Sequence, residues 1–446
     1  MTSIAQPRRL SRTWRALAVS CACSLALGGV SGHAAERPTC KGQKATVVGT
    51  PDADELQGTE QRDVIVGMGG EDQIVARGGN DLVCSGRGAD FVEAGTGADR
   101  VDAGKDSDTV HGGRGDDSIA TGRGAVEALF GGAGDDRLSG GAGDFDGLIG
   151  GPGDDVLDGG GGLDTAEFWD STGGIVADLR SDSASGFGDD AVIDIEGIVG
   201  SNYDDVLDGD DESNRLVGQA GDDVLRAHDS GPLEGGLGDI VEGGPDDDLI
   251  DGGDGADVAS YDDAPAAMTV DLDDGTATGE GTDDIAGIEA VIASDFDDEL
   301  LGDGGDNAFA GGAGNDLLDG RGGRDQAAYF DANAPVDVDL EAGTATGWGS
   351  DTLIAMEDVV GSAGPDTLAG DGVGNVIDGG SRSDSIRGAD GDDVLLGGPG
   401  DDDADGGDGS DACDAETESN CEGEPPRLGS WSGLVTGWPL LDDRER

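Results

Sequence analysis

The chain has 446 residues, of which 98 are acidic and 25 are basic, so its formal net charge at pH 7 is −73. Such a charge repels nucleic acid and anionic membrane surfaces, and it attracts cations. With 88 glycines, 35% hydrophobic residues and 4% aromatic residues, the composition alone is closer to that of an acidic disordered chain than to that of a packed globular domain.

Residues 1–35 differ from everything that follows. Arginines begin the segment, the apolar run ALAVSCACSLALGGV occupies 16–30, and the small residues of GHAAE follow at 32–36. This pattern predicts a secretory signal peptide that is cleaved near Ala34 or Ala35, and an early arginine pair leaves the twin-arginine export route open. A membrane anchor is the alternative, but a run of about 15 residues is shorter than the ~20 that span a bilayer. No other segment is apolar enough to span.

Four cysteines follow the signal sequence, at positions Cys40, Cys84, Cys413 and Cys421. An even number in a secreted chain favours disulfides. Two lie near the start of the repeats described below and two lie just past their end. We therefore expect the first two to pair with each other and the last two likewise, although four cysteines allow three pairings. A zinc site is the alternative, but the spacings lack CxxC and only His111 and His228 remain after cleavage.

From Gly49 the chain repeats every nine residues. Glycines occupy the first, second and fourth places, as in GGRGDDSIA at 112–120. The sixth place is aspartate at positions Asp54, Asp63, Asp72, Asp81, Asp90, Asp99, Asp108 and Asp117. The eighth place is aliphatic at positions Leu56, Ile65, Ile74, Val83, Val92, Val101, Val110 and Ile119. A disordered chain has no need of an aliphatic residue at a fixed place in every repeat, so we expect these repeats to fold.

After Ile119 the pattern falters. In TGRGAVEALF (121–130) one residue is added and Val126 replaces the aspartate, and GGAGDFDGLI (140–149) slips again at Phe145. The other repeats of this stretch restore the sixth-place aspartate at positions Asp136, Asp155 and Asp164. We expect metal sites at the broken repeats to be weak or absent.

The motif GGxGxDxUx, with U aliphatic, resembles the nonapeptide of the repeats-in-toxin (RTX, hemolysin-type) calcium-binding family. The resemblance implies a parallel β-roll in which each nonapeptide forms a six-residue turn and a three-residue strand, two nonapeptides complete a coil, and Ca²⁺ lies between successive turns on one side. Glycine permits the turn conformation, and carbonyl and carboxylate oxygens are the ligands that Ca²⁺ takes. Turns on one side are then 18 residues apart, so Asp81, Asp99 and Asp117 are expected to stack, as are Asp90 and Asp108.

A longer repeat begins at Asp164. The segments DTAEF (164–168), DVASY (257–261) and DQAAY (325–329) share an Asp-x-Ala-x-aromatic start, and a glutamate follows each of them, at positions Glu196, Glu289 and Glu357. Within these spacers, MTVDLDDGTATG (268–279) and VDVDLEAGTATG (336–347) alternate apolar and polar residues around a glycine turn. The alternation predicts a β-hairpin in each spacer.

Fresh nonapeptides follow each spacer and complete the set of candidate ligands. The predicted calcium ligands are the aspartates of the sixth place, namely Asp54, Asp63, Asp72, Asp81, Asp90, Asp99, Asp108, Asp117, Asp136, Asp155, Asp164, Asp223, Asp248, Asp257, Asp316, Asp325, Asp384, Asp393, Asp402 and Asp411. Asparagine takes that place once per copy, at Asn214, Asn307 and Asn375. A neutral amide offers an oxygen but no charge, so we expect those turns to be structural or weak sites.

The fold class expected is all-β: a parallel β-roll, or β-solenoid, with β-hairpin spacers. Its expected parts are the signal peptide (1–35), an N-terminal lead-in (36–48), a first calcium-binding β-roll (49–165), three units of spacer plus β-roll repeats (166–256, 257–324 and 325–423) and a tail (424–446). The tail leaves the repeat pattern and carries Trp431 and Trp438, which are expected to dock on the end of the roll or to hang free.

No catalytic motif accompanies the repeats. The sequence contains no HExxH, and GSWSG (429–433) has Trp431 where a nucleophile elbow has serine. His111 and His228 are expected to be surface residues, and the many paired acids follow the repeat period. We therefore expect a secreted, extracellular, non-enzymatic protein that folds on binding several Ca²⁺ ions and acts as a structural, adhesion or matrix module, with an extracellular surface or matrix ligand as partner. The alternatives are a calcium-dependent secreted enzyme or toxin with its activity in the spacers, and a passive calcium store without a partner.

Overall fold

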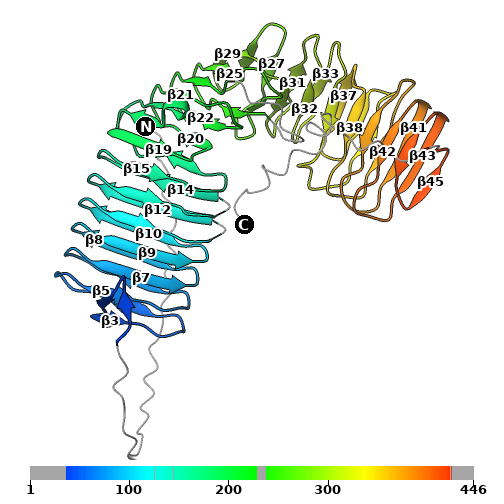
Figure 1. Cartoon of the computed structure of the whole chain (residues 1–446). Coiled ribbons are helices and arrows are strands. Elements are labelled where there is room, and N and C mark those ends of the chain that lie inside the picture. The colour runs from blue at the N-terminus through cyan, green and yellow to red at the C-terminus, as the bar shows by residue number, and fades with distance from the viewer. Residues whose placement is uncertain (1–36, 125, 144, 229–237, 422, 424–446) are drawn as a thin grey trace, which may run out of the picture. The chain divides into compact units, whose positions relative to one another are not determined.

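The computed structural model describes residues 37–124, 126–143, 145–228, 238–421 and 423. Within them the chain forms many short β-strands, as Figure 1 shows. One turn of 3-10 helix, η1 (Leu179–Ser181), is also present. The signal peptide and the tail with Trp431 and Trp438 lie outside the described residues. No helix in the described ranges has the length and apolar character needed to cross a membrane.

Most strands belong to two parallel sheets, which form the two sides of the roll. Sheet one contains β4 (Glu55–Gln57), β6 (Gln73–Val75), β8 (Phe91–Thr96), β10 (Thr109–Arg114), β12 (Val126–Ala133), β14 (Phe145–Ile149), β16 (Thr165–Glu167), β20 (Gly197–Val199), β22 (Arg215–Val217), β24 (Ile240–Glu242), β26 (Val258–Ser260), β30 (Ala290–Ile292), β32 (Ala308–Ala310), β34 (Gln326–Ala328), β38 (Asp358–Val360), β40 (Val376–Asp378), β42 (Val394–Leu396) and β44 (Ala412–Asp414).

Sheet two contains β3 (Val47–Val48), β5 (Val64–Val66), β7 (Leu82–Arg87), β9 (Arg100–Lys105), β11 (Ser118–Ala120), β13 (Arg137–Ser139), β15 (Val156–Asp158), β19 (Asp189–Ile193), β21 (Val206–Asp208), β23 (Val224–Arg226), β25 (Leu249–Asp251), β29 (Thr282–Ala286), β31 (Glu299–Leu301), β33 (Leu317–Asp319), β37 (Ser350–Ile354), β39 (Thr367–Ala369), β41 (Ser385–Gly391), β43 (Asp403–Gly409) and β45 (Thr417–Ser419). The spacers add β17 (Val176–Asp178), β18 (Ser183–Ser185), β27 (Thr269–Asp271), β28 (Thr276–Thr278), β35 (Asp337–Asp339) and β36 (Thr344–Thr346) to this sheet.

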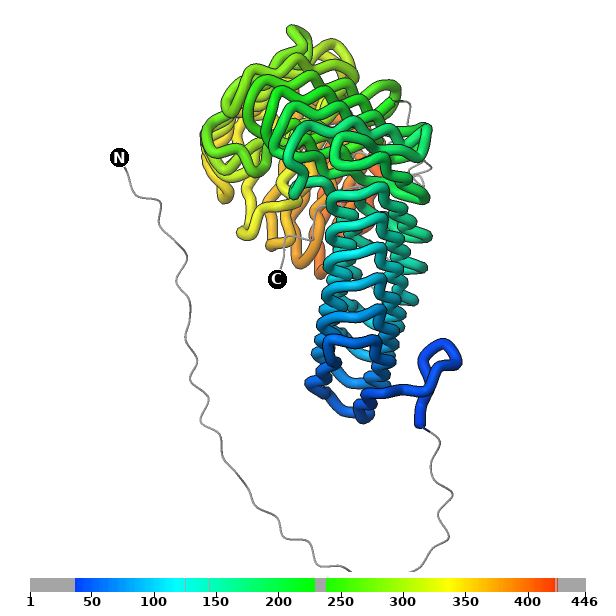
Figure 2. The backbone as a smooth tube through the Cα atoms, turned by 90° about the vertical axis from the view of Figure 1, so that its left-hand side faces the viewer, coloured from blue at the N-terminus to red at the C-terminus, as the bar shows by residue number. Residues whose placement is uncertain are grey.

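The register of the sheets confirms the predicted parallel β-roll. Val83 on β7 faces Val101 on β9, and Val92 on β8 faces Val110 on β10, so each coil takes two nonapeptides. The trace in Figure 2 shows these coils stacked one on the next. The eighth-place aliphatic residues point inward: Ile65, Ile74 and Val83 are fully buried. The core is therefore one layer of aliphatic side chains between the two sheets, and the turns lie at its two edges.

Each spacer is a three-stranded antiparallel meander built into sheet two. The predicted hairpins are confirmed, because Val270 on β27 faces Ala277 on β28 and Val338 on β35 faces Ala345 on β36. A third strand then returns the chain to the roll. In the first spacer, β19 pairs in parallel with β15 while β17 pairs in parallel with β21.

The shared aromatic residue of the spacers fills the core beside these meanders. Phe168, Tyr261 and Tyr329 are buried in the continuous apolar core of the roll. The widened coil at each spacer thus keeps an apolar interior.

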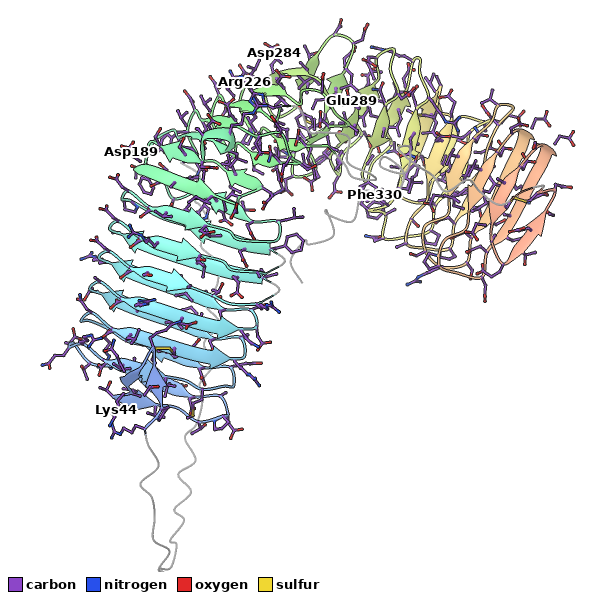
Figure 3. All side chains as sticks on the ribbon, in the orientation of Figure 1. Lys44, Asp189, Arg226, Asp284, Glu289 and Phe330 are labelled. Carbon is purple, nitrogen blue, oxygen red and sulfur yellow. A yellow bond between two sulfur atoms is a disulfide. The ribbon has the colours of Figure 1, made fainter. Side chains whose placement is uncertain are left out.

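Both expected disulfides are present. Cys40 is bonded to Cys84 and Cys413 is bonded to Cys421. Cys40 comes from a short antiparallel hairpin, β1 (Thr39–Cys40) and β2 (Gln43–Lys44), which lies against β5 and β7. Figure 3 shows the sulfur bond close to the labelled Lys44. The bridge ties the lead-in to the first coils, and the second bridge joins β44 to the residues that follow the last coil.

The faltering repeats at 121–130 and 140–149 stay in register with the neighbouring coils. Val126 and Phe145 are exposed, and Leu129 faces both Val110 and Leu148 across the sheet. The added residue is absorbed in the turn, so the acid of the sixth place is shifted by one position. Glu127 and not Val126 takes that place, and Asp146 and not Phe145 takes it in the second case.

The two histidines are half-buried on the roll. His111 stacks on Phe130 of the next coil, with ring centroids 4.3 Å apart, and Nε2 of His228 lies 3.8 Å from Asp208. Burial lowers the pKa of His111, and this effect is larger than the opposing effect of Glu93.

Candidate metal centre

The sixth-place aspartates form a hydrogen-bonded ladder along each edge of the roll. The main-chain N–H of Asp81 donates to Oδ1 of Asp99 over 2.7 Å, and the N–H of Asp99 donates to Oδ1 of Asp117 over 2.7 Å. On the other edge, Asp90 donates in the same way to Asp108 over 2.9 Å. The predicted stacking of both sets is confirmed. One oxygen of each carboxylate therefore fixes the preceding coil, and the other stays available.

That second oxygen is buried and has no hydrogen-bond partner among the described residues. It is Oδ2 of Asp72, Asp81, Asp90, Asp99, Asp108, Asp117, Asp136, Asp155, Asp164, Asp223, Asp239, Asp248, Asp257, Asp316, Asp325, Asp384, Asp393 and Asp402, and Oε1 of Glu127. A buried carboxylate oxygen without a donor or cation is costly, and native proteins rarely keep one. Its repetition along both ladders points to a ligand that each turn is built to hold.

The first-place glycine leaves room for that ligand. A methyl carbon added to Gly112 would lie 2.6 Å from Oδ2 of Asp117 and 2.6 Å from the carbonyl oxygen of Gly131 in the next coil. A carboxylate oxygen of one coil and a carbonyl oxygen of the next thus converge on one small space. Gly113 and Gly115 flank it in left-handed conformations, each with φ of 113°, which only glycine adopts readily.

The metal-free ladder is electrostatically unfavourable at neutral pH. Burial raises the pKa of Asp108 to about 8, and repulsion from Glu127, Asp90 and Asp106 adds to the effect. Burial and neighbouring aspartates likewise raise the pKa of Asp117 to about 7. Both effects disfavour a charged carboxylate, and a cation bound to the carboxylates removes both.

The turns offer a metal ion few side-chain ligands and many main-chain carbonyl oxygens. No group of three or more acidic, histidine or cysteine side chains converges anywhere in the described part of the chain. The turns instead offer carboxylate oxygens from the ladder together with main-chain carbonyl oxygens. Hard oxygen donors of mixed type suit Ca²⁺, whereas Zn²⁺ prefers nitrogen and sulfur. The residues present therefore fit calcium.

Some turns satisfy their own carboxylate. Asp63 accepts from the main-chain N–H of Thr59 over 2.7 Å and from its hydroxyl over 2.8 Å, both through Oδ2. Burial alone would raise the pKa of Asp63, but hydrogen bonds from Thr46 and Thr59 outweigh it and hold the pKa below its usual value. Thr50 caps Oδ2 of Asp54 in the same manner.

The same cap recurs once after every spacer. Ser201 caps Asp205, Ser294 caps Asp298 and Ser362 caps Asp366, each through its main-chain N–H and its hydroxyl. In all these turns a serine or threonine stands at the second place, where many of the other turns carry a left-handed residue.

The asparagine turns are also closed by hydrogen bonds of their own. Oδ1 of Asn214 accepts from the main-chain N–H of Asp210 over 2.6 Å, and its Nδ2 donates back to Oδ1 of Asp210 over 3.3 Å. Asn375 and Asp371 make the same exchange. The amide thus meets an aspartate at the second place, an arrangement that serves the turn itself.

Sequence reasoning missed the ladder positions inside the spacers. Asp190, Asp283 and Asp351 each accept the main-chain N–H of the preceding ladder aspartate through Oδ1, over 2.8, 3.2 and 3.2 Å. The signal was present as GFGDDAV, GEGTDDI and GWGSDTL, which keep the second, fourth, sixth and eighth places of the motif. The first-place glycine is replaced by serine or threonine there, so a search that starts from GG passes over them.

Several glutamates and one further aspartate also occupy ladder positions. The spacer glutamates Glu196, Glu289 and Glu357 accept main-chain N–H groups through Oε2 at 2.8–3.0 Å. Glu127 accepts from Asp108 over 2.9 Å and Glu416 accepts from Asp402 over 3.0 Å. Asp239 accepts from Asn214 over 2.7 Å. The longer side chain of glutamate reaches the same point from a turn of different length.

The repeat pattern also matches a known family. The sequence profile described as "RTX calcium-binding nonapeptide repeat (4 copies)" matches residues 48–83, 85–119, 121–144, 146–166, 198–229, 235–262, 292–327 and 378–412, together more than half of the chain. The matched segments contain most of the ladder turns, and they leave out the spacers together with the ladder positions Asp190, Asp283 and Asp351. No curated protein matches the chain.

Proposed function

Because this chain belongs to the RTX calcium-binding nonapeptide repeat family, we propose that it is a secreted protein whose β-roll folds when Ca²⁺ enters the turns, and that the folded roll serves as a structural, adhesion or matrix module. The observation that carries the proposal is the row of buried carboxylate oxygens without donors along both edges of the roll. Bound calcium supplies positive charge and coordination to these oxygens.

The proposed ligands are the sixth-place aspartates of the uncapped turns. They are Asp72, Asp81, Asp90, Asp99, Asp108, Asp117, Asp136, Asp155, Asp164, Asp223, Asp248, Asp257, Asp316, Asp325, Asp384, Asp393, Asp402 and Asp411. We add Glu127, whose Oε1 is buried like the aspartate oxygens. We leave out Asp54 and Asp63, because threonine already donates to the oxygen that a cation would use.

Folding and calcium binding are coupled in this account. Successive ladder carboxylates lie one strand spacing apart, about 4.8 Å, and the formal charge of the chain is −73. Without cations the chain repels itself, because the carboxylates of the uncapped turns would be buried next to one another. Sites that exist only in the folded chain convert binding free energy into folding free energy.

The setting proposed is outside the cell. Extracellular calcium modules bind with Kd of about 10⁻⁴–10⁻³ M, well above the free calcium of a cytosol. Two disulfides stabilise the ends of the roll, and such bonds persist in oxidising compartments. The basic and apolar N-terminal segment supports export. The chain would therefore leave the cell unfolded and fold where calcium is abundant.

The spacers support a structural role over a catalytic one. They are meanders that continue sheet two, and their aromatic residues pack into the shared core. Acidic side chains such as Asp189 and Asp284, labelled in Figure 3, line the exposed surface of the coils beside them. The product is a stiff acidic surface suited to contacts with a surface or matrix ligand.

Circular dichroism of residues 36–446 during a calcium titration tests the proposal, with Mg²⁺ as the control cation. We expect a cooperative transition from coil to β-structure at about 10⁻⁴–10⁻³ M Ca²⁺ and none with Mg²⁺. Magnesium demands a small octahedral site and keeps its waters, so carbonyl-rich turns do not serve it. A chain already folded in chelator, or unfolded at high calcium, would refute calcium-driven folding.

A further inference from the structure

We propose that four coils, at 49–66, 200–217, 293–310 and 361–378, take no calcium at their own turns and remain folded without it, so that each is the template on which the next calcium-dependent stretch assembles. We call them the capped coils. The inference rests on the proposed calcium-driven folding of the other coils and adds to it a division of the roll into two kinds of coil.

The capped coils replace the cation by hydrogen bonds on both edges. In 293–310, the hydroxyl of Ser294 donates to both oxygens of Asp298 at 2.9 Å, and its N–H donates to Oδ2 at 2.8 Å. On the opposite edge of the same coil, the N–H of Asp303 donates to Oδ1 of Asn307 at 2.9 Å. The coil carries one buried charge where an uncapped coil carries two, and that charge is fully hydrogen-bonded.

The other capped coils use the same chemistry. In 200–217 and 361–378, serine caps an aspartate and a second-place aspartate meets an asparagine. In 49–66, threonine caps both aspartates, Asp54 and Asp63. None of the ladder carboxylates of these coils is among the buried oxygens that lack a donor in the described structure.

The backbone at the second place differs between the capped turns and most of the uncapped turns. Met68, Arg77, Gln219 and Ala389 are left-handed there, with φ of 88°, 79°, 78° and 80°, although they are not glycine. Their turns belong to the uncapped kind. The second-place serines, threonines and aspartates of the capped coils have no such conformation. A left-handed residue cannot aim its N–H at the sixth-place carboxylate as Ser294 does, so the carboxylate stays bare.

Three capped coils also follow spacers that place large apolar side chains in the core. The spacer before 293–310 buries Tyr261 and Met268, and the coil itself buries Leu300 and Phe309. In the next copy, the hydroxyl of Tyr329 donates to Oδ2 of Asp351 over 3.1 Å, so that spacer carboxylate is satisfied as well. The first capped coil instead packs Val64 and Val66 against Cys40 and Ala45 of the lead-in. Each capped coil thus has an apolar support that needs no metal.

Every uncapped stretch begins directly after a capped coil. The stretches 67–164, 218–257, 311–325 and 379–411 follow the four capped coils in turn, and their first strands pair in parallel with strands of those coils, as β23 pairs with β21 and β33 pairs with β31. Forming the first coil of a parallel sheet is the slow step, because distant residues must meet before any pairing is gained. A capped coil that is already folded supplies strand edges on which the next coil can pair.

Hydrogen–deuterium exchange of residues 36–446, read by peptide in chelator and in calcium, tests the inference. In chelator we expect amides of the capped coils to exchange about tenfold or more slowly than those of 67–164, because local stability differs along a chain. In calcium all the stretches should be protected. If the capped coils exchange in chelator as fast as 67–164 while calcium protects everything, the inference fails and calcium-driven folding stands. If calcium changes nothing, calcium-driven folding itself fails.

A pair of variants ties the effect to the cap. Ser294→Gly removes the hydroxyl and should abolish the extra protection of 293–310 in chelator, while calcium still protects that coil. Ser294→Thr keeps a hydroxyl of the kind that Thr50 and Thr59 already use, and it should exchange like the parent chain. Equal exchange of the glycine variant and the parent in chelator would show that the cap does not hold the coil.

Discussion

The N–H of Asp99 donates to Oδ1 of Asp117 over 2.7 Å, while Oδ2 of Asp117 is buried without a hydrogen-bond donor among the described residues. One carboxylate thus does two things: it joins its coil to the preceding one, and it presents a bare oxygen to the turn. The roles of the two oxygens can be tested separately by replacing the aspartate with asparagine. The side-chain amide of asparagine keeps a hydrogen-bond acceptor but has no negative charge.

Asp117→Asn should weaken calcium-driven folding. The amide oxygen can still accept from Asp99, but the charged ligand oxygen is lost, so we expect a higher calcium midpoint and about 1–3 kcal/mol less stability in calcium. The matched control is Asp116→Asn, which changes the neighbouring exposed carboxylate. Calcium titrations followed by circular dichroism compare the two variants. Identical midpoints for both would mean that the buried oxygen is not a ligand.

Gly112→Ala should fill the space where the two coils meet. The added carbon would lie 2.6 Å from Oδ2 of Asp117 and from the carbonyl oxygen of Gly131, at a backbone angle that alanine tolerates. Overpacking of this kind costs about 1–3 kcal/mol. Gly161→Ala is the control, because nothing lies within 4 Å of its added carbon. Thermal unfolding in calcium should separate the variants, and a harmless Gly112→Ala would argue against a ligand in that space.

The stability of the metal-free roll should fall as pH rises. Burial raises the pKa values of Asp108, Asp239, Asp248 and Asp316 from 3.8 to about 8. At pH values between the ordinary pKa and the raised pKa, the folded chain binds more protons than the unfolded chain. Lowering the pH therefore stabilises the metal-free fold, and raising the pH destabilises it. In chelator, circular dichroism should therefore show more β-structure at pH 5 than at pH 8.

Calcium-driven folding should depend on pH in the opposite direction. Protons and Ca²⁺ compete for the same carboxylates, so the calcium midpoint should rise as the pH falls from 8 to 5. A midpoint that does not change with pH would show that the raised pKa values belong to groups that calcium leaves alone.

The two disulfides should differ in what they contribute. Cys40 and Cys84 are 44 residues apart, whereas Cys413 and Cys421 are 8 apart. Chain entropy predicts that the free energy of unfolding falls by about 4 kcal/mol when the first bridge is removed and by about 2.5 kcal/mol when the second is removed. Hydrogen exchange at each end of the roll, in the paired Cys→Ser variants, measures the local loss. An equal effect at the two ends would show that loop length does not set the contribution.

Most of the fold could be predicted from the repeat, because the geometry of the coil sets the period of the sequence. Asp81 and Asp99 stack because turns on one edge recur with each coil, and the aliphatic residue two places later must point inward. The disulfide pairs followed from where the cysteines fall relative to the repeats. What the period could not show is how a turn absorbs an extra residue, so Val126 was placed at the sixth position and Glu127 was not recognised as the acid of that turn.

The division between capped and uncapped turns also needed coordinates. Thr59 and Arg77 both stand at the second place, and both replace glycine. Only the backbone shows that Thr59 turns its N–H and hydroxyl toward Asp63 while Arg77 adopts a φ of 79° and leaves Asp81 bare. The spacer aspartate Asp190 was missed for a related reason, since its turn keeps the motif but not the leading glycine.

The central claim is that cations occupy the uncapped turns, and a crystal structure of residues 36–446 grown in calcium tests it most directly. We expect strong density between the coils beside Oδ2 of Asp81, Asp99 and Asp117, coordinated by main-chain carbonyl oxygens, and none beside Oδ2 of Asp63. Water or protein donors in place of ions at the uncapped turns, in a crystal that contains millimolar calcium, would contradict the account.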